Sequence, residues 1–359
     1  MKNITLRIAP AANAAFSHRT LLGKSCRGHV EAALEGAGLS LSNAAIPSPV
    51  VLWVREDAPC LEADSLTALT DAARKGQTAA LFSADEKTLL AAAFPSNALA
   101  NSSPEAFASQ LSPKTSDFCL TENSPVVDCA ASYSAALQLL KQRIMEKHMA
   151  NGVIFLEPTQ TIVEADVAIG AGTMLFPGNV LQGKTVIGEG CMLYPNNRIS
   201  NGIIGNETTI ENSVLLDCTV GSHTTVGPFA YLRPKTKIGD HCRIGDFVEV
   251  KNSAIDDGTK VSHLTYVGDS DLGKNINLGC GVVFVNYDGK SKSRSVVEDH
   301  AFIGCNCNLV SPVHIGKSAY LAAGSTITED VPEDALYIAR SQGTVKKDWV
   351  KRRKEKGKL

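Results

Sequence analysis

The sequence contains no long apolar run and carries little net charge. No stretch of about 18 consecutive apolar residues occurs, so we expect no membrane-spanning segment. Arg7 and Asn13 interrupt the short apolar stretch near the start, so we expect no signal peptide. A net charge of −2 gives no reason to expect nucleic acid as a partner. Together these absences favour an ordinary soluble protein with ample apolar core.

The ten cysteines form no CxxC pair, and only Cys305 and Cys307 lie close together in the sequence. Disulfide frameworks and structural zinc sites use regular, closely spaced cysteines. We therefore expect a cytoplasmic protein whose reduced thiols fill small core positions.

Aliphatic residues, by contrast, recur with a short and regular period. Between residues 169 and 327 a rung of this ladder returns every five or six positions, with one interruption. The 27 rungs are Ile169, Leu175, Leu181, Ile187, Leu193, Ile199, Ile204, Ile210, Leu215, Val220, Val226, Leu232, Ile238, Ile244, Val250, Ile255, Val261, Val267, Leu272, Leu278, Phe284, Val297, Ile303, Leu309, Ile315, Leu321 and Ile327. Such a period is typical of hexapeptide coils, in which three rungs complete one turn of a triangular prism. Stacked turns pair as parallel strands about 4.8 Å apart and bury one aliphatic column.

The interruption lies between Phe284 and Val297, where 13 positions replace the usual six. We expect residues Val285–Val296 to form a loop outside the prism, and long excursions from a rigid repeat are usually functional. After the ladder, eight Lys or Arg residues occur among the 14 residues from Lys346 to Leu359. This segment is either a solvated tail or an arm that holds a polyanion.

Before the ladder, the pattern is that of a small α/β layer. The expected elements are strands at Ile4–Ala9 and Val50–Val54, helices at Ala63–Lys75 and Ser132–Met149, and a polar loop at Asn97–Asn123. The predicted domains are an α/β domain at 1–130, a linker helix at 131–152, a β-helix at 153–332 and a C-terminal basic tail at 333–359.

The register of the coils brings two cations together. Arg233 and Lys251 each directly follow a rung, so their side chains stack outside the prism on adjacent coils. Two such cations repel each other by about 1 kcal/mol in water, and a phosphate bound between them would reverse that repulsion. Glu249 and Tyr266 stack beside them, where they are placed to contact the hydroxyls and the amine of a sugar. A chance pairing of surface cations is the alternative.

A histidine stands at the foot of a column of small residues. His263 lies two positions after a rung, and Cys280, Cys305 and Ala323 occupy the same offset on later coils. Such a column leaves a groove about 14 Å long. A thin ligand such as a pantetheine arm fits this groove with its reactive end at His263. The alternatives are a structural histidine and the general preference of hexapeptide coils for small residues.

Five motifs now identify a family. They are Gly227-Pro-Phe-Ala-Tyr-Leu-Arg-Pro234, Gly245-Asp-Phe-Val-Glu-Val-Lys251, Ser262-His-Leu-Thr-Tyr-Val-Gly-Asp269, Asn277-Leu-Gly-Cys-Gly281 and Val285-Asn-Tyr-Asp-Gly289. In this order and spacing, they closely resemble the bifunctional bacterial enzymes with N-acetylglucosamine-1-phosphate uridyltransferase and glucosamine-1-phosphate acetyltransferase activities. The resemblance is continuous from about Ser132 to Lys347.

The resemblance implies a mainly β protein with a left-handed parallel β-helix, an exception to the right-handed crossovers usual between parallel strands. A small degenerate nucleotidyltransferase-like α/β domain precedes it. The resemblance also implies a homotrimer with active sites between subunits. The implied reaction moves the acetyl group of acetyl-CoA to the amine of glucosamine 1-phosphate. Its product feeds the synthesis of UDP-N-acetylglucosamine and hence of cell-wall peptidoglycan.

The same resemblance assigns roles to individual residues. His263 is the expected general base, and Glu249 is expected to orient the amine or the histidine. The expected substrate contacts are Arg233 and Lys251 on the phosphate, Tyr266 and Asn277 on the sugar, and Lys292 on a phosphate across the subunit interface. The expected acetyl-CoA contacts are Cys280, Asn286, Tyr287, Cys305, Ala323 and Arg340.

The N-terminal part departs from the family. Where the family has a Gly-rich phosphate loop of the form LAAGxGTRM, residues 8–16 of this chain contain no glycine, so backbone amides cannot approach phosphates closely. Asp57 resembles the family's Mg²⁺-binding aspartate, but Val127 stands where its partner asparagine is expected. We therefore expect an incomplete Mg²⁺ site and no uridyl transfer.

Three other interpretations stay open. The first is a bifunctional enzyme that retains UTP-dependent uridyl transfer. The second is a hexapeptide enzyme of the zinc carbonic anhydrase type, which needs three histidines, usually including an H-x4-H pair that the β-helix histidines do not form. The third is a non-catalytic trimeric scaffold with a relic site.

Overall fold

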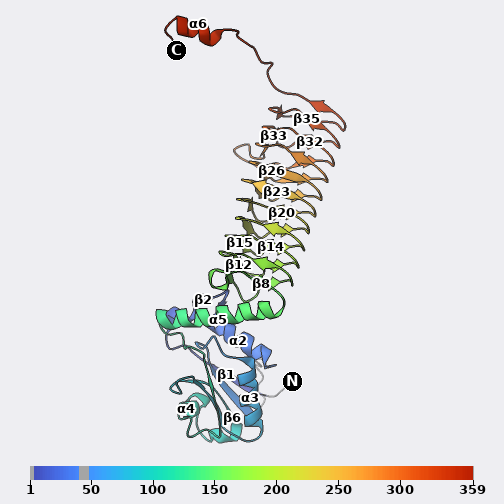
Figure 1. Ribbon diagram of the computed structural model, residues 1–359. Helices are drawn as coiled ribbons and strands as arrows, with labels where there is room; N and C mark the ends of the chain where they lie inside the picture. Colours follow the sequence, from blue (N-terminus) through green and yellow to red (C-terminus); the bar gives the residue numbers. More distant parts are fainter. Residues whose placement is uncertain (1–3, 40–47, 359) are drawn as a thin grey trace. The chain divides into compact units, whose positions relative to one another are not determined.

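The computed structural model describes residues 4–39 and 48–358 (Figure 1). The chain forms two compact units. The first comprises the residues up to 153 together with 158–168 and 180–184, and the second comprises 154–157, 169–179 and the residues from 185 onward. No helix within the described ranges is long and apolar enough to cross a membrane.

The first unit is built on a mixed sheet with the strand order β1–β4–β6–β5–β7. These strands are β1 (Thr5–Ala9), β4 (Val50–Arg55), β6 (Leu89–Pro95), β5 (Ala79–Ser83) and β7 (Phe118–Glu122). Alternate residues of β4 point to opposite faces and enter two separate apolar clusters. Because both faces are covered, the apolar residues of this strand are all buried.

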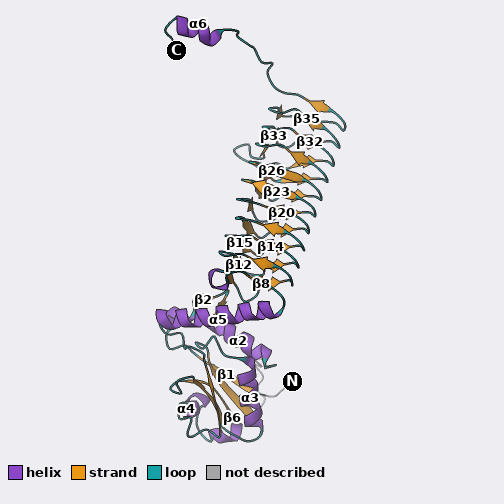
Figure 2. Cartoon of the chain, in the orientation of Figure 1, coloured by secondary structure: helices purple, strands orange, loops and turns teal. Residues whose placement is uncertain are grey.

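Helices cover this sheet, and smaller elements complete the unit (Figure 2). They are α1 (Ala14–Ser17), α2 (Cys26–Gly36), α3 (Ala63–Arg74), α4 (Pro104–Ala108), α5 (Ala130–Ala150), the 3-10 helices η1 (Ser96–Leu99) and η2 (Pro158–Gln160), the hairpin strands β2 (Thr20–Leu21) and β3 (Lys24–Ser25), and the parallel pair β9 (Ile162–Val163) and β12 (Val180–Gln182). The expected strands and helices correspond to β1, β4, α3 and α5. The long helix α5 buries Ala136 and Leu140 and ends at Ala150, with Asn151 as its C-cap.

The expected loop at Asn97–Asn123 is wrong in three places, the first of which is η1 at its start. Helix α4 begins after Ser103, whose hydroxyl oxygen accepts a hydrogen bond from the Ala106 amide at 3.1 Å, with Pro104 at its first position. Strand β7 pairs in parallel with β5 at the edge of the sheet. Its residues are only partly apolar, so pairing with a neighbour rather than a local pattern makes this segment a strand.

The second unit is a stack of coils with three parallel sheets as its sides (Figure 1). One side, the β24 sheet, contains β15 (Arg198–Ser200), β18 (Val214–Leu216), β21 (Tyr231–Leu232), β24 (Glu249–Lys251), β27 (Tyr266–Gly268), β30 (Val283–Val285), β33 (Asn308–Val310) and β36 (Thr326–Ile327). The next side, the β25 sheet, contains β13 (Val186–Ile187), β16 (Ile203–Ile204), β19 (Thr219–Val220), β22 (Lys237–Ile238), β25 (Ala254–Ile255), β28 (Ser270–Leu272), β31 (Ser295–Val297) and β34 (His314–Ile315). Strand β10 (Ala168–Ile169) lies where the two units divide.

The third side, the β26 sheet, contains β8 (Ile154–Phe155), β11 (Met174–Leu175), β14 (Met192–Leu193), β17 (Thr209–Ile210), β20 (Thr225–Val226), β23 (Arg243–Asp246), β26 (Lys260–His263), β29 (Asn277–Leu278), β32 (Phe302–Ile303), β35 (Tyr320–Leu321) and β37 (Leu336–Tyr337). The chain passes from the β26 sheet to the β24 sheet and then to the β25 sheet in each turn. The β24 sheet therefore meets the β26 sheet at one corner and the β25 sheet at the other.

The predicted aliphatic column is confirmed. Every one of the 27 rungs is buried, with at most 9 % of its surface exposed. On the β26 sheet Val226 pairs with Ile244 and Ile244 with Val261, which are the spacings of 17 to 18 residues expected for one turn. Burial of each such side chain contributes about 1.5–3 kcal/mol, so the column stabilises the coil and fixes its register.

The excursion between β30 and β31 is slightly shorter than expected, since β30 continues to Val285 and β31 begins at Ser295. The loop between them is ordered by its own contacts. The Asp288 carboxylate accepts hydrogen bonds from the amides of Lys290 and Ser291, at 2.7 and 2.6 Å. After the coils, the basic segment forms α6 (Trp349–Glu355), which buries no residue.

Candidate active site

The predicted site residues gather around the outer face of the β24 sheet. Tyr231, Glu249 and Tyr266 lie in register on β21, β24 and β27, with their side chains outside the coil. One corner of this face, here called the cationic corner, joins it to the β25 sheet and carries Arg233 and Lys251. The opposite corner, here called the histidine corner, joins it to the β26 sheet and carries His263.

At the cationic corner, Arg233 is held by a neighbour on the next coil. Its Nη1 donates a hydrogen bond to Glu249 Oε1 at 2.8 Å, and the guanidinium lies over the Tyr231 ring at 5.9 Å from the centroid. The hydrogen bond to Glu249 raises the pKa of Arg233. The Glu249 carboxylate therefore pairs with Arg233, the residue predicted to bind the phosphate. The sequence predicted instead that Glu249 orients the amine or the histidine.

Lys251 and Lys292 lie beside each other at the same corner. The positive charge of Lys251 lowers the pKa of Lys292, and Arg233 adds to that effect. Lys251 Nζ lies 3.5 Å from Asp269 Oδ2. Three cations thus share one corner with two carboxylates, and a dianion such as a phosphate would relieve their mutual repulsion.

Asp269 connects several residues of the cationic corner through its carboxylate. Its carboxylate accepts hydrogen bonds from Asn252 and Asn286, each at 2.5 Å. Burial by itself raises the pKa of Asp269, but these hydrogen bonds and Lys251 together lower it. Asn286, predicted as an acetyl-CoA contact, is buried and donates its amide to Asp269, so it anchors the start of the excursion loop.

At the histidine corner, His263 pairs with an acid that the sequence analysis did not single out. His263 Nδ1 and Asp246 Oδ1 lie 2.5 Å apart, and the two residues are register partners on adjacent strands. The hydrogen bond to His263 lowers the pKa of Asp246. The signal was present in the sequence, because Asp246 follows rung Ile244 by two positions, as His263 follows Val261.

The predicted column of small residues continues from His263. The rungs Val261, Leu278, Ile303 and Leu321 are successive register partners, so His263, Cys280, Cys305 and Ala323 follow them at one corner. Cys305 is exposed and Cys280 half-buried, and both are free thiols. Arg340 Nη1 donates to the Ala323 carbonyl oxygen at 2.8 Å, which places a cation at the far end of the column.

Three predicted residues do not lie with the group that they were expected to accompany within one chain. Asn277 lies on the β26 sheet between Lys260 and Phe302, around the histidine corner from Tyr266. Asn286 and Tyr287 belong to the cationic corner, whereas the small-residue column follows the histidine corner.

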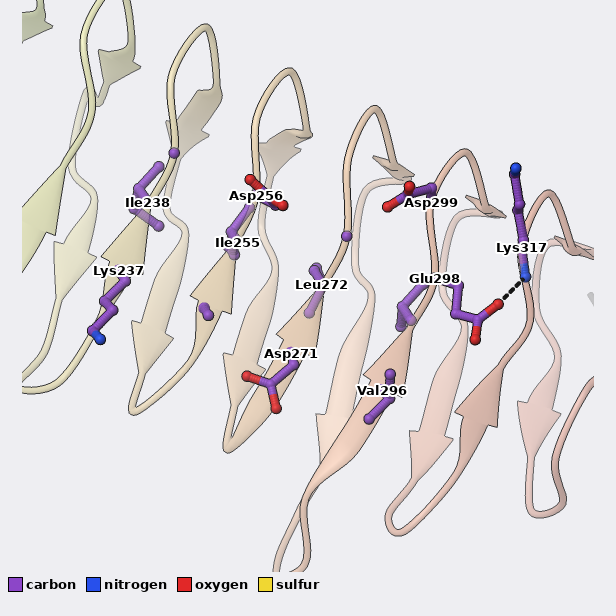
Figure 3. A pocket seen from close by; sticks show the side chains of 14 residues that line it. Lys237, Ile238, Ile255, Asp256, Asp271, Leu272, Val296, Glu298, Asp299 and Lys317 are labelled. Carbon is purple, nitrogen blue, oxygen red and sulfur yellow. Dashed lines mark hydrogen bonds between the residues drawn. The ribbon is translucent and has the colours of Figure 1, made fainter.

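A separate groove of about 600 Å³ lies on the outer face of the β25 sheet (Figure 3). It contains none of the predicted site residues. Its acidic side chains already have partners, since Asp271 forms an ion pair with Arg294 and Glu298 accepts from the Lys317 amide at 2.9 Å. We place the candidate site on the β24 sheet instead, because an excess of cations flanks that sheet at one corner and a histidine flanks it at the other.

In the first unit, Asp57 is the residue that resembles a metal-binding aspartate, and its carboxylate already binds other groups of the same chain. Asp57 is fully buried, and its two carboxylate oxygens accept from Arg55 Nε and Nη2 at 2.8 and 2.9 Å. The Ala12 amide donates to the same carboxylate at 3.1 Å. A Mg²⁺ ion requires oxygen ligands that are free to bind it, so these residues do not fit the ion.

The neighbouring positions agree with that interpretation. The Val127 amide donates to the Asp57 carbonyl at 2.8 Å, so Val127 lies beside Asp57, where an oxygen ligand would be needed. The Ala11 amide donates to Glu56 Oε1 at 2.8 Å. The Ala11 and Ala12 amides, in the segment that replaces the phosphate loop, thus donate to carboxylates of the same chain.

The repeat is recognised by a family model for bacterial transferase hexapeptide (six repeats), which matches residues 217–252. Together with the three parallel sheets and the coil period, this match defines the class. The chain contains a left-handed parallel β-helix built from hexapeptide repeats, as the resemblance implied.

The chain is also similar in sequence to curated proteins. The chain is 52 % identical over 230 residues to the bifunctional protein GlmU of Clostridioides difficile, which is 64 % of this chain and 50 % of that protein. It is 53 % identical over 213 residues to the bifunctional protein GlmU of Acetivibrio thermocellus, covering 59 % of this chain and 46 % of that protein. The chain spans about half the length of the curated relatives it matches, and the predicted resemblance is confirmed over that half.

Among solved structures, the polySia specific acetyltransferase NeuO matches 55 % of this chain and 90 % of its own chain. The identity is 15 % and the TM-score 0.22, which is too low to support a structural comparison.

Proposed function

We propose that the chain transfers the acetyl group of acetyl-CoA to the amine of glucosamine 1-phosphate. The observation that carries the proposal is that one sheet face joins a corner with three cations to a corner with an exposed histidine. A phosphorylated amino sugar has the matching chemistry, with a dianion at one end and a nucleophilic amine at the other. The identity of about half the residues with GlmU proteins over the same segment supports the assignment.

In this proposal the phosphate binds between Arg233, Lys251 and Lys292. The sugar ring then lies across Tyr266, and its amine points toward His263. Arginine supplies a planar fork for two phosphate oxygens, whereas the lysines act as point charges. Glu249 keeps the Arg233 fork oriented toward the substrate.

His263 acts as the general base. An ammonium group cannot attack a thioester, so the amine must lose a proton before or during attack. The amine nitrogen forms a bond to the thioester carbonyl carbon, and His263 Nε2 takes the released proton. The tetrahedral intermediate then collapses, the carbon–sulfur bond breaks, and the CoA thiolate leaves and takes a proton from the imidazolium. The column of Cys280, Cys305 and Ala323 holds the pantetheine arm, and Arg340 meets the phosphates of CoA.

The proposal includes a homotrimer. Asn277, Asn286 and Tyr287 face away from their own chain's histidine corner or lie at its other corner, and we assign them to the site of a neighbouring subunit. Lys292 lies beside Lys251 in its own chain, on the excursion loop, and a phosphate of its own chain's site and one across the interface are alternative partners for it.

For the first unit we propose the absence of uridyl transfer. The supporting observation is that Asp57 is neutralised by Arg55 and that loop amides donate to carboxylates of the chain. Two alternatives remain to be tested. They are an enzyme that keeps both activities and a trimeric scaffold without activity.

The test is release of free CoA from acetyl-CoA by the full chain, measured with glucosamine 1-phosphate and with other amino-sugar 1-phosphates. Fast release with glucosamine 1-phosphate, lost in His263→Ala with an unchanged oligomeric state, supports the proposal. Release with none of these sugars supports the scaffold, and pyrophosphate formed from UTP and N-acetylglucosamine 1-phosphate supports the bifunctional enzyme.

A further inference from the structure

Asp246 and His263 form a pair whose geometry is set by the coil itself. Asp246 is the last residue of β23 and His263 the last residue of β26, and the two are direct register partners. The contact between Oδ1 and Nδ1 is 2.5 Å. The aliphatic rungs two positions earlier are fully buried, so the backbone beneath the pair is rigid.

The chemistry of the pair fixes which nitrogen carries the proton. An ionised carboxylate only accepts hydrogen bonds, and the hydrogen bond to His263 lowers the pKa of Asp246, so Asp246 is ionised at neutral pH. Nδ1 must then be the donor. In the neutral imidazole, the lone pair is therefore on Nε2, which is the atom that a base must present to an amine.

The remaining charged groups around the histidine corner do not replace Asp246. Arg243 and Lys260 are register partners on the same two strands and face outward from the β26 sheet. Glu249 is engaged by Arg233. Cys280 follows on the next coil. Within residues 4–39 and 48–358, Asp246 is the only side chain that hydrogen-bonds the His263 ring.

We infer that Asp246 is the positioning residue of the proposed general base, holding His263 in the tautomer and orientation that direct Nε2 at the acceptor amine. This inference rests on the proposed function and adds a residue to it. Asp246 itself touches neither the sugar nor acetyl-CoA, and acts through the histidine.

Two similar pairs elsewhere in the coil supply matched controls. His223 Nδ1 lies 3.2 Å from Glu207 Oε2, and His314 Nε2 lies 3.0 Å from Glu298 Oε1, again between adjacent coils. Both pairs belong to the β25 sheet or its corner with the β26 sheet, away from the β24 sheet. A histidine–carboxylate pair is therefore a recurring surface feature of this coil, and its position at the histidine corner distinguishes Asp246.

The decisive substitution is Asp246→Asn. The asparagine amide can donate to Nδ1, which favours the tautomer with the proton on Nε2. We expect kcat to fall about ten- to a hundredfold, less than for loss of the base itself, while the KM for glucosamine 1-phosphate stays within about twofold. Asp246→Glu should recover part of kcat, and Glu207→Gln should change neither quantity.

A spectroscopic measurement separates this inference from the proposed function. The full-length protein is labelled with ¹⁵N-histidine, and the His263 signal is assigned as the one that disappears in His263→Gln. The ¹⁵N chemical shifts of that signal report the His263 tautomer. We expect the neutral ring of the unsubstituted protein to carry its proton on Nδ1 and that of Asp246→Asn to move it, at least partly, to Nε2. If the tautomer and kcat are both unchanged in Asp246→Asn, the inference is overturned. If the unsubstituted protein transfers no acetyl group, the proposed function fails, while the tautomer still decides whether Asp246 positions the ring.

Discussion

Two aspartates, one in each unit, show how similar pairings lead to opposite outcomes. Asp57 in the first unit is fully buried, and Arg55 and the Ala12 amide occupy its carboxylate. Asp246 in the second unit lies on the surface and pairs with a histidine whose other ring nitrogen remains available. The first carboxylate is neutralised inside the fold, whereas the second leaves a basic atom directed outward. A site therefore needs a group with unused bonding capacity as well as the right residue types.

The cations show the same contrast. Arg55 forms a two-point contact with one carboxylate, so charge is balanced locally. At the cationic corner, Arg233, Lys251 and Lys292 exceed the two carboxylates beside them. Such an excess persists most readily where an anionic ligand completes the balance.

The substitution with the largest expected effect on this contrast is His263→Gln. We expect a loss of about 10²- to 10⁴-fold in kcat for acetyl transfer, because the amine loses its proton acceptor. Far-UV circular dichroism and the sedimentation coefficient should not change, since the side chain is exposed and outside the aliphatic column. Substitution of His314, which pairs with Glu298 elsewhere on the coil, is the matched control and should retain activity. Equal losses in both variants would contradict the assignment.

The next effect concerns Lys251. In Lys251→Ala we expect the KM for glucosamine 1-phosphate to rise about ten- to a hundredfold, because a charge-assisted contact to the phosphate is removed. The rise should shrink as salt increases, since screening already weakens the contact in the unsubstituted enzyme. Lys260→Ala on the β26 sheet is the control. A rise in KM for acetyl-CoA alone would move the phosphate site elsewhere.

A smaller effect is expected in the first unit. Arg55→Ala leaves the Asp57 carboxylate buried without its main partner, which should destabilise the unit by about 2–3 kcal/mol. Acetyl transfer per folded molecule should stay within about twofold. Arg74→Ala, which breaks the surface pair with Asp71, should change the free energy of unfolding by less than about 1 kcal/mol. Chemical denaturation measures both, and a loss of transfer in Arg55→Ala without unfolding would link the units functionally.

The smallest effect is a pH dependence in the same unit. Glu122 is buried, and that burial raises its pKa above 4.5 against the opposing effect of a hydrogen bond from Ser65. The folded state thus keeps the proton at pH values where the unfolded chain loses it, so stability declines as pH rises through that window. Glu122→Gln should match the unsubstituted protein near pH 4 and be more stable at pH 7, by roughly 1 kcal/mol. Exposed Glu35→Gln should show no such difference in thermal denaturation.

The coil was predictable because its register follows from counting residues. Once the rungs are known, Arg233 must stack with Lys251 and His263 must begin the column of small residues, and the structure places them so. Pairings within the register were less predictable. Glu249 lies within one or two coils of both Arg233 and His263, and the structure shows that it pairs with Arg233. Asp246 occupies a readable offset, but its value depends on a 2.5 Å contact that no spacing specifies.

Residues outside the repeat were harder to predict for another reason. Strand β7 is formed by pairing with β5, a partner distant in sequence. Asn286 stays predicted as an acetyl-CoA contact, but its hydrogen bond to Asp269, at the point where the excursion loop leaves the coil, could not be predicted. Without a repeat, no register links such residues to their neighbours in space.

The most direct test of the central claim is a binding measurement by calorimetry with glucosamine 1-phosphate and with glucosamine, in the unsubstituted protein and in Lys251→Ala, alongside CoA release in His263→Gln. We predict that binding requires the phosphate and Lys251, and that His263→Gln binds the sugar phosphate normally without releasing CoA. Tight binding of unphosphorylated glucosamine, or undiminished CoA release by His263→Gln, would contradict a site that spans the β24 sheet from the cationic corner to the histidine corner.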